Sequence, residues 1–238
     1  MVEKNNMKIL VSLLIFLFAP QMIWANNQLW QYSKSDSTKI VALLDEAKNE
    51  KEDTNFPLYF ANKFIGIRYV ASTLERNKTE KLVINLQELD CTTLVENVLA
   101  LTLCVKTKQY SFNQFCTFLQ KIRYNNGVIS YPTRLHYFSE WINDNTKQGF
   151  VKEINTPNPP FKSQQILDLH YMSTQHHKYP MLVQNPSWIK EIRTMEQMVS
   201  GKTVNYIPKG ILNNSSLIKD IIKDGDIIAI VTAKKGLD

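Results

Sequence analysis

The sequence predicts an α+β domain that is rich in helix and has only a small sheet. A long, mostly apolar stretch follows Asp90 and is typical of a helix buried on most of its sides. Other segments, such as residues 111–124, repeat apolar residues at helical spacing. Strand candidates are few for a sheet of usual size, with suitable runs at residues 81–86, 203–207 and 227–232.

The first elements are two helices and a strand. Residues 35–50 carry apolar side chains on one face and begin with Ser35–Ser37, whose side chains can cap a helix. Residues 56–70 mix aromatic and aliphatic side chains and contain Gly66, which predicts a helix that runs into a turn. Residues 81–86 alternate and are β-branched, so we expect a short strand there.

Shorter helices follow the long one. Residues 111–124 start with a serine suited to the N-cap and end at Asn125–Gly127, which stops a helix. Residues 135–145 form a short helix that carries aromatic side chains. Residues 185–201 begin with Asn-Pro and end on a glycine suited to the position after a helix, and residues 216–223 form another short helix.

The last expected element is a strand. A turn at Asp224–Asp226 leads into residues 227–232, an apolar run typical of a buried strand. A lone buried strand leaves its backbone groups unpaired, so this one needs a partner. The partner would be residues 81–86 or 203–207, or a strand beyond residue 238 in a chain that is cut short at its C-terminus.

Residues 1–25 predict a secretory signal that is removed from the mature protein. Lys4 and Lys8 form a positive start, residues 9–20 are an apolar run too short to span a bilayer comfortably, and Ala25 suits a cleavage site. The alternative is an uncleaved N-terminal anchor. We find no other segment able to span a membrane, and we expect an exported protein of the periplasm or cell envelope.

The mature domain, residues 26–238, is expected to be globular after a loose start at residues 26–34. Hydrophobic residues are 44% and charged residues 21% of the chain, which is ordinary globular usage. With 7 Gly, 9 Pro and 3 Cys, the collagen-like, low-complexity and disulfide-scaffold classes are excluded. The formal charge of +6 is spread thinly, without the basic runs of a nucleic-acid-binding protein.

Cys91 is the candidate nucleophile because it stands at the start of the long helix. The partial positive charge and free N–H groups of a helix N-terminus favour a thiolate and can stabilise an oxyanion. The neighbouring Asp90 carboxylate opposes the thiolate, and a plain buried cysteine is the alternative. Cys104 lies about 20 Å along the same helix, too far for a disulfide with Cys91. Cys104 and Cys116 are packing cysteines or a pair with each other.

Several segments, in one order, resemble a known family. They are GIRYVASTLE (66–75), LVINL (82–86), LDCTTLVE (89–96) and RLHYFSEWI (134–142). Through them the chain, from about residue 35 to its end, resembles the bacterial N-acetylmuramoyl-L-alanine amidase-like group. That group belongs to the NlpC-type papain-like cysteine hydrolases.

The resemblance implies a papain-like core in which the cysteine lies on a central helix packed against a small antiparallel sheet. It implies that Cys91 attacks amide bonds in cell-wall peptides and that Tyr69 and Asp90 line the pocket or hold the oxyanion. The chain departs from the family at Arg68, where related sequences often have proline. A family-typical segment supplies residues that bind substrate or support the site: Arg134, His136, Tyr137 and Trp141.

The resemblance also implies a general-base histidine on a strand after the cysteine helix. Residues 225–238 resemble the first core strand and its turn, so the base is expected beyond residue 238. Of the histidines present, His136 is the best substitute, and a structural or substrate-binding role is its alternative. Glu96 is expected to be a buried, paired carboxylate that holds the fold.

No metal and no cofactor are expected. His170, His176 and His177 lie near Asp168 in the sequence, but their spacing matches no metal-site motif and no free cysteine is close. A loop with surface histidines is the better interpretation.

Together these features predict an exported cysteine amidase or peptidase that acts on peptidoglycan stem peptides or muropeptides. The alternative belongs to a different class: a non-catalytic murein-binding protein, or an inactive truncated remnant that lacks its base. The sequence leaves open which amide bond is cut and whether the sugar is required.

Overall fold

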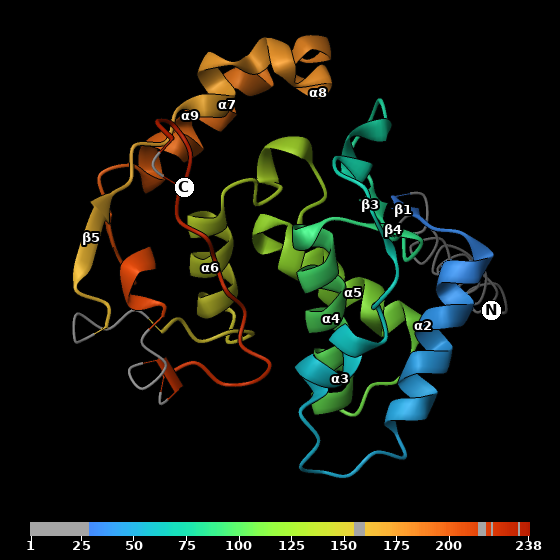
Figure 1. Ribbon diagram of the computed structural model, residues 1–238. Coiled ribbons are helices and arrows are strands. Elements are labelled where there is room, and N and C mark those ends of the chain that lie inside the picture. Colours follow the sequence, from blue (N-terminus) through green and yellow to red (C-terminus); the bar gives the residue numbers. More distant parts are fainter. Residues whose placement is uncertain (1–28, 155–159, 214–217, 220, 233) are drawn as a thin grey trace, which may run out of the picture.

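The computed structural model describes residues 29–154, 160–213, 218–219, 221–232 and 234–238, and its fold is α+β and rich in helix (Figure 1). The expected signal at residues 1–25 lies outside the described residues, as does part of the helix expected at 216–223. The α-helices are α2 (Lys34–Ala47), α3 (Phe56–Asn62), α4 (Cys91–Lys106), α5 (Phe112–Arg123), α6 (Phe138–Lys147), α7 (Tyr171–Thr174), α8 (Pro180–Gln184) and α9 (Trp188–Val199). The strands are β1 (Trp30–Gln31), β2 (Arg68–Tyr69), β3 (Leu82–Val83), β4 (Glu88–Leu89), β5 (Ser163–Ile166) and β6 (Thr203–Tyr206).

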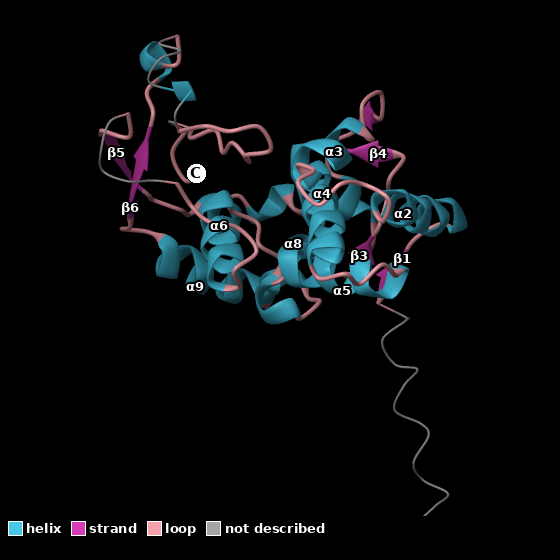
Figure 2. Cartoon of the chain, turned by 90° about the horizontal axis from the view of Figure 1, so that it is seen from below, coloured by secondary structure: helices cyan, strands magenta, loops and turns pink. Residues whose placement is uncertain are grey.

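Helix α4 is the centre of the larger hydrophobic core (Figure 2). It packs against α2, α3 and α5, and its side chains are buried from Glu96 almost to its end. Apolar residues occur on nearly all of its faces, so none of them is suited to water. The long helix expected after Asp90 is confirmed. The helix expected after Ser111 is also confirmed as α5. The Ser111 hydroxyl caps it by accepting a hydrogen bond from the Gln114 amide at 3.1 Å.

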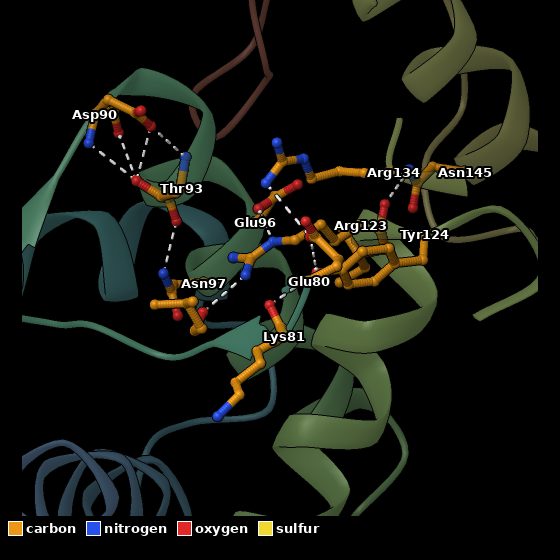
Figure 3. Close-up of polar contacts among 12 residues, drawn as sticks. Glu80, Lys81, Asp90, Thr93, Glu96, Asn97, Arg123, Tyr124, Arg134 and Asn145 are labelled. Atoms are coloured by element: carbon orange, nitrogen blue, oxygen red, sulfur yellow. Dashed lines mark hydrogen bonds and ion pairs between the residues drawn. The ribbon is translucent and has the colours of Figure 1, made fainter. Parts of the chain in front are cut away.

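A buried ion pair joins α4 to α5 (Figure 3). Glu96 is 2% exposed and Arg123 is 1% exposed, and Arg123 Nε donates to Glu96 Oε2 at 2.7 Å. Arg123 Nη1 donates to the carbonyl of Val83 in β3, also at 2.7 Å. A buried charge is tolerated only when it is paired and hydrogen-bonded, and here both conditions hold. The structural role expected of Glu96 is confirmed.

Among the described residues, the strands form three separate pairs instead of the one small antiparallel sheet that the family resemblance implied. β1 pairs with β3 and β2 pairs with β4, both in parallel, and only β5 and β6 pair antiparallel. A parallel pair needs a long connection. The first pair has one because α2, α3 and β2 lie between its strands. The second pair encloses β3 and the 3₁₀ turn η1 (Thr73–Arg76).

The prediction of a strand at residues 227–232 is wrong. The segment has no assigned strand, and its apolar side chains are exposed: Ile227 45%, Ile228 61%, Ile230 79% and Val231 38%. The two partners considered within the chain pair with other strands and not with this segment, one as β3 with β1 and the other as β6 with β5. An apolar run becomes a strand only where a backbone partner is free to pair with it.

The observed helix boundaries differ by a few residues from the predicted ones, because local capping sets where each helix begins. Ser33 caps α2 in place of Ser35–Ser37, because Ser33 and Asp36 form a reciprocal capping box. The helix expected at 135–145 begins only at Phe138. β1 falls in the segment expected to be a loose start, because its backbone pairs with a strand far along the chain.

A second, smaller hydrophobic cluster is built by α7, α8 and α9 with the segment before α6. Its buried polar centre is Glu196, which accepts hydrogen bonds from the Tyr137 hydroxyl at 2.7 Å and the Ser173 amide at 3.1 Å. In Figure 1 these helices form an arch beside the α4 core. None of the helices in the described part of the chain combines the length and apolar character that a bilayer crossing requires.

Candidate active site

Cys91 is the first residue of α4, and the contacts between Asp90 and Thr93 fix the start of that helix (Figure 3 shows these two residues). Asp90 is the N-cap: its Oδ1 accepts from the Thr93 amide at 2.8 Å, and the Thr93 hydroxyl accepts from the Asp90 amide at 2.9 Å. This reciprocal capping box stops the helix from starting earlier or later. Cys91 is exposed, as a nucleophile requires, and it lies at the positive end of the α4 dipole.

The β2–β4 pair brings Tyr69 to Cys91. Tyr69 stands opposite Leu89 in the parallel register, and the Val70 amide donates to the Leu89 carbonyl at 3.0 Å. Because Leu89 lies two residues before Cys91, this register places Tyr69 beside the start of α4. Tyr69 is 68% exposed, so its phenol is accessible to a ligand.

A pocket of about 240 Å³ opens at this point. It is mostly apolar, with the thiol and the capping carboxylate among its walls, and it suits a short, uncharged part of a substrate. The pocket is lined by Phe64, Ile67, Tyr69, Leu89, Asp90, Cys91 and Leu94. The structure therefore brings together the three residues that the sequence placed at the reaction centre.

Sequence reasoning missed the apolar wall of this pocket. Phe64 and Ile67 come from the turn after α3, and Leu94 lies one turn beyond Cys91 on α4. Leu94 could have been predicted from the sequence as a neighbour of Cys91, because residues three apart share a helix face. Phe64 could not have been predicted in this way, because its approach to Cys91 depends on how α3 packs against α4.

Arg134 does not line the pocket. It is 5% exposed and forms ion pairs with Glu75 and Glu80. Glu80 also accepts a hydrogen bond from the Tyr124 hydroxyl at 2.7 Å (Figure 3). Burial raises the pKa of Glu80, and the positive charge of Arg134 opposes that shift. This network ties the loop after α5 to the segment before β3, so Arg134 acts on the structure of the domain.

His136, Tyr137 and Trp141 are not part of the pocket lining either: Tyr137 and Trp141 are buried, and His136 is half-buried. His136 Nε2 lies 2.8 Å from the Tyr131 carbonyl oxygen, and burial, with the nearby charge of Arg134, lowers its pKa to about 3. The Tyr137 hydroxyl donates to Glu196, and Trp141 is 5% exposed in the α4 core. A supporting role for these residues stays a prediction.

None of the four histidines contacts Cys91 in the arrangement of the described residues. His170 Nδ1 lies 3.3 Å from Asp168 Oδ1, and His176 Nδ1 lies 3.1 Å from the Ser173 carbonyl oxygen. Within the described ranges, no group of three or more His, Cys, Asp or Glu side chains is arranged to hold a metal ion. Cys104 and Cys116 are buried, free thiols in the core.

Replacing Asp90 with alanine is expected to lower the free energy of unfolding by about 1 kcal/mol, because the helix loses its N-cap acceptor. Asp90→Asn is the matched control, since an amide oxygen still caps the helix and most of the stability should remain. Urea denaturation followed by circular dichroism measures both. Equal midpoints for wild type and Asp90→Ala would show that the capping box contributes nothing.

Comparisons with known proteins identify the family of the chain. Residues 59–238 match the family described as N-acetylmuramoyl-L-alanine amidase-like, or AmiA-like. The chain is similar to an N-acetylmuramoyl-L-alanine amidase from Bacteroides uniformis, with 41% identity and a TM-score of 0.67 over 77% of this chain and 75% of that one. No curated protein sequence matches the chain.

Two further solved structures resemble the chain. One is a putative xylanase from Bacteroides fragilis, with 40% identity and a TM-score of 0.59 over 64% of this chain and 66% of that one. The other is a Legionella pneumophila protein with 20% identity and a TM-score of 0.56, which shows likeness of fold alone. It covers 80% of this chain and 67% of that one. By the family match and the identity to the Bacteroides uniformis amidase, this chain belongs to the N-acetylmuramoyl-L-alanine amidase-like family.

Proposed function

We propose that this protein hydrolyses the amide bond between the N-acetylmuramoyl group and L-alanine in peptidoglycan fragments, with Cys91 as the nucleophile. The observation that carries the proposal is an exposed thiol at the N-terminus of α4, inside a pocket, in a chain of the amidase-like family. Family membership supports the amidase activity, and the geometry of the site supports the choice of Cys91.

The chemistry would proceed through a thioester. The Cys91 sulfur attacks the lactyl carbonyl carbon, a C–S bond forms, and the negative charge moves to the carbonyl oxygen. Amide N–H groups at the start of α4 and the Tyr69 phenol are the donors available for that oxygen. The C–N bond then breaks and the alanine nitrogen leaves with a proton as a free amine. Water hydrolyses the C–S bond, which releases the carboxylate and restores the thiol.

This arrangement supports Cys91 as the nucleophile but, among the described residues, offers no candidate for the general base. A base must lie within hydrogen-bond reach of the thiol, or one water away, and the Cys91 sulfur has only the Thr92 hydroxyl at 4.0 Å among its described contacts. His136 is a poor base because it has no hydrogen bond to the Cys91 sulfur, its Nε2 lies against the Tyr131 carbonyl, and its lowered pKa makes the imidazole weakly basic.

The substrate is proposed to be met outside the cytoplasm, because peptidoglycan lies there and residues 1–25 have the pattern of a secretory signal. The peptidoglycan partner follows from the family, and the exported location follows from the sequence pattern.

The test is an assay of the full chain on N-acetylmuramoyl-L-alanyl-D-isoglutamine, with the products identified by mass spectrometry. Release of N-acetylmuramic acid and free L-alanyl-D-isoglutamine is expected. A sugar-free stem peptide serves as the control, since it has no muramoyl amide. Cleavage of both compounds within the peptide would make the protein a peptidase, and no cleavage of either would overturn the proposal.

A murein-binding protein without turnover is the second candidate. The observation that favours it is the lack of a histidine contact at Cys91 among the described residues. Binding of the muramoyl dipeptide with no product after prolonged incubation would support this candidate over the hydrolase.

A further inference from the structure

Two arginines share one carboxylate beside the Cys91 pocket. Arg68 Nη2 and Arg76 Nη1 pair with the two different oxygens of Glu88, the second at 2.6 Å. Arg68 is on β2, Glu88 is on β4 and Arg76 is in the turn η1. Both arginines hold the pKa of Glu88 below its usual range, with Arg76 the larger influence, so Glu88 stays ionised.

The position of this group is set by the strand register. Arg68 stands opposite Glu88, and the next pair in register is Tyr69 and Leu89, both of which line the pocket. Alternation along a strand places Arg68 and Glu88 on the other face from that next pair. Arg68 is flanked in the chain by Ile67 and Tyr69, and Glu88 directly precedes Leu89, so the backbone of this group borders the pocket although neither arginine lines it.

The exposure of the three side chains shows which of them is available to a ligand. Glu88 is 18% exposed, whereas Arg68 is 72% exposed and Arg76 is 54% exposed. Within the described part of the chain, Glu88 is the partner found for either guanidinium. A guanidinium has five N–H donors, so most donors of both remain free. The group carries one more positive charge than negative charge.

A purely structural role explains this arrangement poorly. Exposed ion pairs contribute little to stability, and one arginine would neutralise Glu88. The second arginine instead leaves a surplus of charge and directed donors, which is the usual means of recognising a carboxylate. The pocket of about 240 Å³ is too small for a peptide, so the rest of a peptide bound at Cys91 must cross the rim.

We propose that Arg68 and Arg76, held in place by Glu88, form a subsite for a free carboxylate of the peptide part of the substrate. This inference rests on the proposed function, and it specifies an anionic stem peptide as the preferred substrate class. Glu88 is the positioning residue of the subsite, and the two guanidinium groups contact the ligand.

The test compares the affinity of three probes by calorimetry: N-acetylmuramoyl-L-alanyl-D-glutamate, its α-amide, and its α,γ-diamide. Cys91→Ala protein is used so that no probe is consumed during the titration. The diacid is expected to bind about 5-fold more tightly than the diamide, the size of a partly exposed charge-assisted contact. Comparison with the α-amide identifies which carboxylate is recognised. The preference should weaken as salt concentration rises.

Variants locate the effect. Arg68→Gln and Arg76→Gln should each reduce the preference for the diacid and leave the affinity for the diamide unchanged. Arg68→Lys should retain part of the preference, because it keeps the charge and loses the fork of donors. Arg193→Gln is the matched control, an exposed arginine on α9, and it should change nothing.

The outcomes separate this inference from the proposed function. Equal affinity for the three probes, or a preference that both arginine variants retain, would overturn the subsite even if wild-type protein cleaves the muramoyl amide. A preference that depends on Arg68 and Arg76 would support the subsite even if wild-type protein releases no product. In that case the proposed hydrolysis would be wrong and the carboxylate subsite would stand.

Discussion

Replacing Cys91 with alanine is expected to lower kcat/KM for muramoyl-peptide hydrolysis by on the order of 10⁴-fold or more, because the attacking atom is lost. The variant should fold normally, since Cys91 is exposed and its side chain supports no core contact. Cys91→Ser should be nearly as inactive, because a hydroxyl forms the anion far less readily than a thiol. Hydrolysis is followed by release of the free alanyl amine.

Alkylation provides an independent control on the same residue. Iodoacetamide should label Cys91 in the native protein and spare Cys104 and Cys116, which are fully buried. Burial raises the pKa of Cys104 to about 12 and that of Cys116 still further. Native Cys91→Ala should therefore take up no label, and in urea both remaining thiols should react. Full activity in Cys91→Ala would remove this residue from the mechanism.

The variant Arg123→Met is expected to lose about 3–5 kcal/mol of unfolding free energy, because it leaves the Glu96 carboxylate buried without a counter-charge. It also leaves the Val83 carbonyl without its donor. Equilibrium denaturation in urea measures the loss. The double variant Glu96→Leu/Arg123→Met should recover much of it, since both charges are then absent. Lys63→Met is the surface control: it removes the exposed Lys63–Glu46 pair and should leave the midpoint unchanged.

The pH dependence of Arg123→Met identifies Glu96 as the cause. Burial raises the pKa of Glu96, and Arg123 opposes that shift, so the variant raises it further. A carboxyl whose pKa is higher in the folded state than in the unfolded state favours folding fully below the unfolded pKa, and this contribution is lost as pH rises. The stability deficit should be largest at neutral pH and should shrink as pH falls toward about 4. A deficit independent of pH would instead indicate lost packing of the arginine stem.

Prediction from local sequence patterns was most successful around Cys91. The run of apolar residues after Asp90 has no polar face, which fixed both the helix and its burial. The apolar run begins directly after Asp90, which predicted the thiol at the helix start, and the observed capping box of Asp90 and Thr93 confirms that start. The same reasoning found the helix after Ser111 and the paired state of Glu96, because a carboxylate inside an apolar helix needs a partner.

The reasoning failed where the outcome depended on pairing between distant segments. Residues 227–232 have the composition of a strand, but strand formation requires a backbone partner, and β3 and β6 pair with β1 and β5 instead of with this segment. β1 was missed for the converse reason, since its short segment has no pattern and gains its structure from Leu82–Val83. Composition describes what a segment can do, and long-range hydrogen bonding selects what it does.

The sequence by itself indicated the candidate nucleophile, its place at the start of a buried helix, and the family to which the chain belongs. Only the tertiary structure decided what surrounds the thiol. The register of β2 against β4 brought Tyr69 to the pocket and set Arg68 opposite Glu88, and contacts elsewhere in the fold hold His136 and Arg134 outside the pocket lining. The physical reason is range: helix caps and apolar periodicity act over a few residues, whereas a pocket is made by contacts between segments that are far apart in the chain.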